Sequence, residues 1–307
     1  MKRIMKKTAA AVLSLAMLAS SAAALNQSGV QNGLAITASA ASNLPPGAIS
    51  FGTYGSVNYW EFGSDIVICS AKAGATSVYV PETINNKPVT TLYFTAFYNN
   101  TTMKSITIDA KLRTLSLEQF EGCTNLTSVV LPSTLETIPM SSFLYCRNLT
   151  KLHIPYNTTK VETGAFAGCT NLKQIIAHGN TSFDNNVFQN IFTKTVTPFT
   201  GKIYCYPGTR PATFAQNKGY NRVFFKMGDV NGNNIIDATD ASQILSFYAS
   251  TSTGGNISAA QREKMEICAD VNCDNRIDAR DASAVLSYYA AISTGYSNSF
   301  EYFMANR

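Results

Sequence analysis

The N-terminal half of the chain repeats its apolar residues with a fixed period of 23 residues. One column consists of phenylalanines: Phe97, Phe120, Phe143 and Phe166. Three further columns keep the same spacing, namely Cys123, Cys146 and Cys169, then Leu126, Leu149 and Leu172, then Leu92, Leu115, Ile138 and Val161. A unit this short cannot bury its own apolar side chains, so its copies must stack on one another. The period therefore predicts a short, β-rich solenoid.

Each repeat is expected to contribute one short strand, such as Leu126 to Leu131, with Leu126, Val129 and Leu131 pointing inward. Adjacent strands lie about 4.8 Å apart, so the cysteine column should form a row of buried thiols. Free cysteine packs as a small apolar side chain, and thiols in a row do not converge on one metal ion. We therefore expect this column to be core packing.

The outward side of the same strands is expected to be exposed. Two columns lie there: Ser105, Ser128, Lys151 and Gln174 in one, and Thr107, Val130, His153 and Ile176 in the other. Because a sugar-binding platform usually offers planar aromatic rings, these aromatic-poor columns do not favour carbohydrate binding. A protein ligand and a merely solvated sheet both remain open.

The amino-acid pattern of the repeat resembles that of a known family. The segment Ala165-Phe166-Ala-Gly-Cys169-Thr-Asn-Leu172, with Ile154-Pro155 upstream, is similar to the BspA-like leucine-rich repeats of bacterial surface proteins. The resemblance covers about residues 50–225, with an irregular patch at 180–199, and predicts a repeat domain at 45–225. It says nothing about the ligand.

Two stretches near the C-terminal end carry the same spacing of oxygen-bearing residues, one starting at Asp229 and the other 41 residues later at Asp270. Calcium loops supply ligands from positions 1, 3, 5, 9 and 12, and a backbone carbonyl from position 7. We therefore predict two Ca²⁺ ions, with Ile235 and Arg276 providing the carbonyls. The predicted ligands are Asp229, Asn231, Asn233, Ile235, Asp237 and Asp240 in the first loop, and Asp270, Asn272, Asp274, Arg276, Asp278 and Asp281 in the second.

The duplication continues past the ligands, since Leu245-Ser246 recurs as Leu286-Ser287. This pattern resembles the type I dockerin, the calcium-binding docking module of cellulosomes, over residues 226–307. An EF-hand sensor is disfavoured because position 12 is Asp240 or Asp281 where EF-hands favour Glu. Position 6 is Asn234 or Asn275 where they carry Gly, and Asn is a suitable substitute because it tolerates left-handed backbone angles.

The resemblance to dockerins implies a small α-helical domain with two calcium loop-helix motifs (F-hands). It also implies calcium-dependent binding to a cohesin domain of a scaffoldin, through loop positions 10 and 11 and one face of each following helix. The residues matched to that role are Ala238, Thr239, Leu245, Ser246, Ala279, Arg280, Leu286 and Ser287. Because Thr239 in one half corresponds to Arg280 in the other, we expect one dominant orientation on the cohesin.

The first residues have the pattern of a secretory signal peptide: Lys2, Arg3, Lys6 and Lys7 precede an apolar run from residue 8 to about 25. Residues 1–40 are therefore assigned to a signal peptide and a possible short leader, with cleavage near 24 or 40. The expected location is extracellular and cellulosome-associated, without a membrane span after signal removal. No run of Lys and Arg favours nucleic-acid binding.

No recognisable catalytic motif accompanies these features. The acidic residues of the repeat region form no motif for glycoside hydrolysis, which needs two carboxylates facing one cleft. His153 and His178 are 25 residues apart, two more than the period, so stacking is not expected to align them and no zinc site is predicted. The seven cysteines do not suggest a disulfide framework, although the redox state of Cys268 and Cys273 stays open.

The sequence thus predicts a noncatalytic, secreted protein that carries a repeat domain for protein or surface interaction. Two alternatives remain open. One is an adhesin-like repeat domain that binds plant-wall or host material. The other is a polysaccharide-degrading enzyme of unrecognised type.

Overall fold

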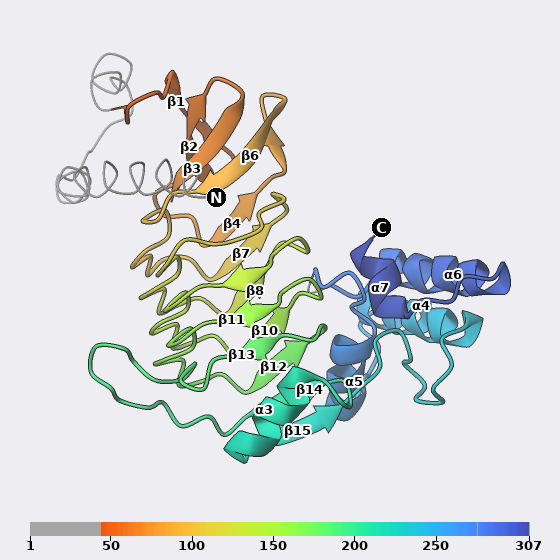
Figure 1. Cartoon of the computed structure of the whole chain (residues 1–307). Helices are drawn as coiled ribbons and strands as arrows, with labels where there is room; N and C mark the ends of the chain where they lie inside the picture. The colour runs from red at the N-terminus through yellow and green to blue at the C-terminus, as the bar shows by residue number, and fades with distance from the viewer. Residues whose placement is uncertain (1–43, 275, 307) are drawn as a thin grey trace.

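The computed structural model describes residues 44–306 with the exception of Asn275 (Figure 1). The predicted signal peptide at 1–40 lies outside the described residues. Within them, no helix is long and apolar enough to cross a membrane.

The described chain begins with a five-stranded sheet in the order β1-β2-β3-β6-β5. Its strands are β1 (Ser50–Tyr54), β2 (Val57–Phe62), β3 (Asp65–Ala71), β5 (Thr83–Ile84) and β6 (Lys87–Leu92). A tight turn joins β5 to β6 through Asn85 and Asn86, whose φ angles of 52° and 61° are left-handed. Asn adopts such angles more readily than most residues, which explains its use at both turn positions.

The solenoid follows, with parallel strands stacked along one side (Figure 1). These are β4 (Ser77–Val80), β7 (Ser105–Ile108), β8 (Ser128–Val130), β10 (Lys151–Ile154), β12 (Gln174–Ala177), β14 (Lys202–Cys205) and β15 (Asn221–Phe224). A second stack holds β9 (Thr137–Ile138), β11 (Lys160–Val161) and β13 (Ser182–Phe183). Ser105 pairs with Ser128, and Lys151 pairs with Gln174. These pairs lie one period of 23 residues apart, as the sequence predicts, whereas Gln174 of β12 pairs with Lys202 of β14, 28 residues on.

The apolar columns form the solenoid core. The rings of Phe97, Phe120 and Phe143 are fully buried, and successive ring centroids are 5.7 and 5.2 Å apart. The thiols of Cys123, Cys146 and Cys169 also lie inside, and each donates to the carbonyl of the phenylalanine 26 residues before it, at 2.9, 3.1 and 3.0 Å. Cysteine suits this position because it combines small volume with a weak donor. All seven cysteines are free thiols.

Helix α3 (Arg210–Lys218) closes the solenoid. Its Phe214 stacks on Phe183 of β13 with ring centroids 5.0 Å apart. The helix ends at Gly219, whose φ of 68° is left-handed and whose N–H bonds back to the last turn. Glycine adopts this conformation without steric cost, and the chain then turns into β15.

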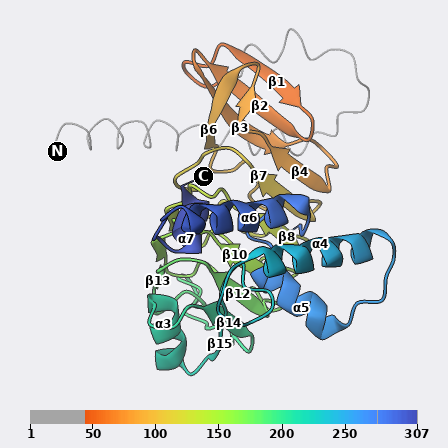
Figure 2. The same cartoon turned by 90° about the vertical axis from the view of Figure 1, so that its right-hand side faces the viewer.

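The C-terminal region is helical, with α4 (Ala238–Ser252), α5 (Ala259–Cys268), α6 (Ala279–Ser293) and α7 (Phe300–Ala305). Ile244 and Phe247 of α4 and Val285 of α6 are buried in its core. The predicted fold class, a repeat solenoid followed by a small α-helical domain, is therefore confirmed. In both views the helices lie beside the strands β10 to β15 (Figures 1 and 2).

One expectation about the solenoid is wrong. Val130, His153 and Ile176, predicted to face solvent, are buried. Ile176 and Tyr204 belong to the same apolar cluster as Met227 and Ile267 of the helical domain. The outward side of β10, β12 and β14 is apolar enough at these positions to pack against a partner, and the helical domain of the same chain is that partner.

Candidate calcium loops and docking face

The two candidate loops end in matched helix caps. Asp237 and Asp278 precede α4 and α6, and each side chain accepts a backbone N–H two residues on, at 2.7 Å. Asp240 and Asp281 complete a capping box by accepting the N–H of the cap residue. Loop positions 9 and 12 are thereby held at a helix N-terminus, where negative charge is stabilised.

In the first loop, carboxylates point inward and organise the backbone. Oδ1 of Asp240 accepts the N–H groups of Val230 and Asn231 at 3.0 and 3.1 Å. Asp229 accepts the N–H of Asn234 through Oδ2 at 2.8 Å, and both acids are buried. Asn234 has a φ of 67°, a left-handed backbone angle that Asn tolerates.

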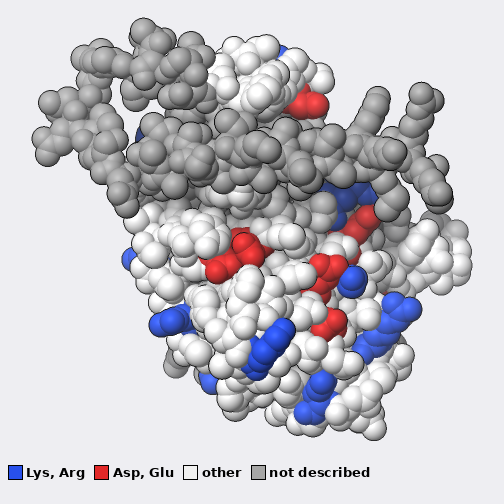
Figure 3. All heavy atoms as spheres, turned by 60° about the vertical axis from the view of Figure 1, so that its left-hand side comes forward, with Lys and Arg blue, Asp and Glu red and all other residues white. Residues whose placement is uncertain are grey.

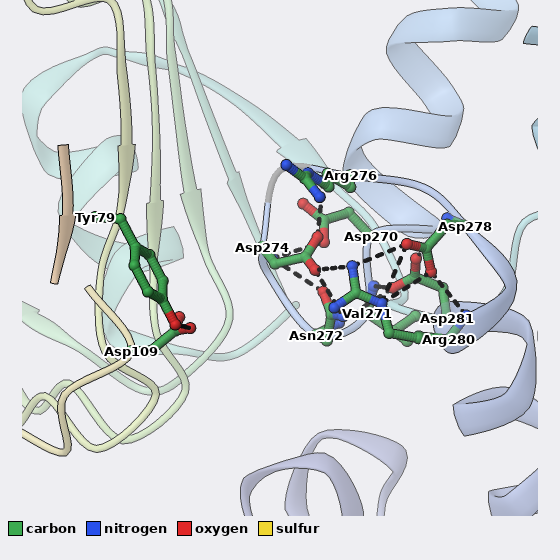
Figure 4. Close-up of polar contacts among 10 residues, drawn as sticks. All are labelled: Tyr79, Asp109, Asp270, Val271, Asn272, Asp274, Arg276, Asp278, Arg280 and Asp281. Carbon is green, nitrogen blue, oxygen red and sulfur yellow. Dashed lines mark hydrogen bonds and ion pairs between the residues drawn. The ribbon is translucent and has the colours of Figure 1, made fainter. Parts of the chain in front are cut away.

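The second loop repeats these contacts and adds a cation. Asp281 accepts the N–H of Val271 at 3.0 Å, as Asp240 does in the first loop. Figure 4 shows the guanidinium of Arg280 between two loop carboxylates, 2.7 Å from Asp274 and 2.8 Å from Asp278. A positive group therefore already lies among the predicted ligands of this loop.

The donor set fits a hard divalent cation. Carboxylate and amide oxygens are the ligands that Ca²⁺ takes. Burial raises the pKa of Asp240 above its usual value and that of Asp281 to about 6, because the protein core disfavours an uncompensated charge. A bound cation would offset that cost. The other predicted ligands lie in the same two loops. The side chains of Ile235 and Arg276, which are predicted to contribute only backbone carbonyls, are exposed.

The predicted cohesin-binding residues are largely exposed on the helical domain, and Ala279 and Arg280 also line the cavity between this domain and the solenoid. Ala238, Thr239, Ala279 and Arg280 are exposed at the starts of α4 and α6, Ser246 is exposed, and Ser287 is partly exposed. Leu245 and Leu286 are 42% exposed, and so are Tyr248 and Tyr289, two tyrosines that are not among the residues predicted to bind cohesin. Their recurrence after 41 residues was the available signal. We call Leu245, Tyr248, Leu286 and Tyr289 the docking face.

Helix α5 attaches the helical domain to the solenoid. Oε1 of Glu263 accepts hydrogen bonds from Tyr204 Oη at 2.6 Å, Lys202 Nζ at 3.0 Å and Gln174 Nε2 at 3.3 Å. Glu266 pairs with Lys151 at 3.3 Å. The hydrogen bonds from Tyr204 and Lys202 lower the pKa of Glu263, which stays ionised. Gln174 and Lys151, expected to be exposed, therefore hold the two domains together.

The expectation that His153 and His178 are not aligned is also wrong. Nδ1 of His153 lies 3.0 Å from Nε2 of His178, and the rings stack at 15°. His153 is paired with Ile176 across β10 and β12, and His178 lies two residues further on the same face. Side chains on one face of a sheet can meet along this diagonal, which the 23-residue period does not capture.

The acidic residues of the solenoid are largely engaged. Asp109 accepts a hydrogen bond from the Tyr79 hydroxyl at 2.7 Å (Figure 4). Four glutamates form ion pairs: Glu61 with Lys87, Glu82 with Lys111, Glu136 with Arg113 and Glu162 with Lys160. On the face drawn in Figure 3, charged side chains of both signs are scattered among uncharged surface. These contacts suit a structural role for the acids.

Two family models match the chain. Residues 76–199 match the BspA type leucine rich repeat region in six copies, and residues 227–289 match the dockerin type I domain. Both domains are noncatalytic. No curated protein matches the chain.

Solved structures of three proteins are similar to the chain at low sequence identity. A T. pallidum leucine rich repeat protein is 19% identical, covering 53% of this chain and 71% of its own, with a TM-score of 0.41. A Bacteroides capillosus leucine-rich repeat protein is 21% identical over 42% of this chain and 99% of its own, with a TM-score of 0.38. Pneumococcal vaccine antigen PcpA is 17% identical over 58% and 48%, with a TM-score of 0.43.

Proposed function

Because the chain carries a BspA-type leucine-rich repeat region followed by a type I dockerin domain, we propose that it is a noncatalytic, secreted component of a cellulosome. In this proposal the dockerin, residues 226–307, binds a cohesin domain of a scaffoldin and so displays the repeat domain, residues 45–225. Both kinds of domain favour an extracellular or cell-surface location, and the dockerin favours a cohesin as partner.

Calcium would act by organising the docking domain. We assign one ion to each loop, held by the twelve predicted ligands, because the two loops share their caps and buried carboxylates. The ion would supply the positive charge that the buried Asp240 and Asp281 lack. Since these residues also start α4 and α6, binding of calcium and folding of both helices would be coupled.

The observation that carries the docking proposal is the docking face itself. Helix α5 faces the solenoid, where the Tyr204 hydroxyl donates a hydrogen bond to Glu263. Leu245, Tyr248, Leu286 and Tyr289 remain exposed to the same extent on α4 and α6. Large apolar and aromatic side chains are typical of residues that contribute most to binding, so this face suits a protein partner while the other side holds the repeats.

The two halves of the dockerin offer different groups at loop position 11. Thr239 is short and uncharged, whereas Arg280 is held by Asp274 and Asp278. Turning the domain over would exchange these groups at the interface, and a mispaired charge there costs several kcal/mol. We therefore expect one dominant orientation, in which Thr239→Ala and Arg280→Ala differ by well over tenfold in their effect on cohesin affinity. Equal, small losses would show that both orientations are used.

The docking proposal is tested by titrating the whole chain against immobilised scaffoldin cohesins with calcium or with a chelator. We expect binding with calcium only, and a loss of at least tenfold in the Tyr248→Ala/Tyr289→Ala variant. Leu117→Ala, which truncates an exposed leucine on the solenoid, is the matched control and should bind normally. Unchanged binding without calcium, or by the tyrosine variant, would contradict the proposal.

The ligand of the repeats is a separate question. The outward side of β4 exposes Tyr79. A pull-down with the whole chain from cell-wall polysaccharides and from secreted proteins distinguishes three functions of the repeats. A single protein partner supports interaction, retention on polysaccharide supports an adhesin, and hydrolysis of any substrate shows an enzyme.

A further inference from the structure

The His153–His178 pair is buried where the two domains meet. Its side chains come from β10 and from the end of β12, and only 3% and 1% of their surfaces are exposed. Burial lowers the pKa of His178 to about 4 and that of His153 well below its usual value. Both rings are therefore neutral near pH 7, which is the form in which imidazole binds metal ions.

The pair does not satisfy its own hydrogen-bonding capacity. One nitrogen of each ring faces the other ring at 3.0 Å. The other two nitrogens, Nε2 of His153 and Nδ1 of His178, are buried without a hydrogen-bond partner among the described residues. A buried polar atom left unpaired is costly and calls for an explanation. Apolar side chains at these two positions would fill the space without this cost, so packing alone does not account for the two histidines.

A cysteine from the helical domain completes the cluster. The Sγ atom of Cys273 and one nitrogen from each ring all lie within 4.8 Å of one another. Among the described residues, this is the one group of at least three His, Cys, Asp and Glu side chains close enough to share an ion. The cluster therefore joins two strands of the solenoid to the second loop of the other domain.

The backbone at Cys273 adds to the argument. It is the fourth residue of its loop, and its φ is 58°. The equivalent residue of the first loop is Gly232, with a φ of 83°. A side chain in this conformation is strained where glycine is not. The second loop thus carries a thiol at a position where glycine would be preferred for the backbone alone.

We propose that His153, His178 and Cys273 form a binding site for Zn²⁺ that links the repeat domain to the dockerin. Two imidazoles and a thiolate suit zinc, whereas the oxygen ligands of the loops suit calcium. Around one zinc ion, ligand atoms lie about 3.3–3.6 Å apart, given Zn–N and Zn–S lengths of about 2.0–2.3 Å. The cluster needs to contract only modestly to reach that spacing. The proton released from the Cys273 thiol passes to solvent.

Three protein ligands leave one coordination position open. A cavity of about 530 Å³ adjoins the cluster and has His178 and Cys273 in its wall. Met227, Ala284 and Met304 line it as well. A water molecule can reach the ion from this cavity and complete a tetrahedral set, as in zinc sites with three protein ligands. Zn²⁺ binding at this site does not require cohesin binding. The zinc proposal can therefore be tested separately from the docking proposal.

The test uses the whole chain, freed of transition metals and saturated with Ca²⁺ so that the loops do not compete. Zn²⁺ is titrated by calorimetry, and Co²⁺ serves as a spectroscopic probe. We expect one Zn²⁺ per chain and a Co²⁺ spectrum with tetrahedral bands and a sulfur-to-cobalt charge-transfer band. In Cys273→Gly, which gives the second loop the residue of the first, we expect the charge-transfer band to vanish and Zn²⁺ affinity to fall on the order of 100-fold.

Cys69→Ser is the control, because Cys69 is a free thiol on β3 within the N-terminal sheet. It should keep the spectrum and the affinity. Zn²⁺ should also raise the melting temperature of the native chain and not that of Cys273→Gly. Absence of a charge-transfer band, or a band of equal strength in Cys273→Gly, would overturn the proposal. Because Cys273→Gly relieves backbone strain, loss of binding in that variant cannot be attributed to misfolding of the loop.

Discussion

The solenoid and the dockerin are both built from repeats, but they bury different chemistry. The repeated interior positions of the solenoid are apolar, and even its cysteine column pairs thiols with carbonyls inside the fold. The dockerin instead buries Asp229, Asp240, Asp270 and Asp281 at its two matched loops. A stack of apolar columns is stable by itself, whereas buried acids need a cation. We therefore expect the solenoid to fold without a metal ion and the dockerin to require one.

The largest effect is expected from removing a buried loop carboxylate. Asp281→Ala deletes the carboxylate that completes the capping box of α6 and is also a predicted calcium ligand, so calorimetry should show the calcium stoichiometry falling from two to one. Circular dichroism should show loss of the α6 helix. Asp65→Ala, the same change on β3 of the N-terminal sheet, is the control and should leave both readouts unchanged. Two ions still bound by Asp281→Ala would contradict the ligand assignment.

In the solenoid, the leucine column should matter more than the cysteine column. Leu149→Ala leaves a cavity in the core and is expected to lower the free energy of unfolding by about 2–5 kcal/mol. Cys146→Ala removes a smaller group and one weak hydrogen bond, so a loss of about 1 kcal/mol is expected.

Thermal melts of the two solenoid variants, with and without reductant, decide the order. Greater damage from the cysteine change would show that the thiol column does more than pack. A melting temperature that depends on reductant would show the same. Either result would weaken the contrast between a metal-independent and a metal-dependent domain.

The contact between the domains should have an intermediate effect. Glu263→Gln keeps the shape of the side chain but removes the charge that binds Lys202, and it is expected to cost about 1 kcal/mol because the pair is partly exposed. Hydrogen exchange should become faster in β14 and α5. Glu82→Gln, at a more exposed pair with Lys111, is the control with little expected change. Equal effects would mean that α5 is not the attachment point.

The smallest effect concerns Arg280. Its guanidinium lies between Asp274 and Asp278, so it competes with a cation for the second loop. Arg280→Ala should therefore strengthen calcium binding at that loop by a few-fold, with Thr239→Ala as the matched control in the first loop. Weaker calcium binding in Arg280→Ala would show that the arginine organises the loop instead of competing.

Much of this architecture follows from periodicity. The 23-residue spacing predicts the buried columns and the register of β7 with β8 and of β10 with β12, because stacking translates each position to the next repeat. The 41-residue spacing likewise predicts the matched loops, and it extends to Tyr248 and Tyr289, which the sequence did not assign to cohesin binding. The diagonal contact of His153 with His178 and the docking of Glu263 on β14 have no periodic signal. They depend on side-chain orientation and on how the two domains pack against each other.

The central claim is that one domain depends on calcium for its fold and the other does not. Hydrogen exchange of the whole chain, read by mass spectrometry with calcium and with a chelator, tests it directly. The account predicts that chelation removes amide protection from α4 and α6 and leaves the strands β4, β7 and β8 protected. Protected α4 and α6 after chelation, or equal loss of protection in those strands, would contradict it.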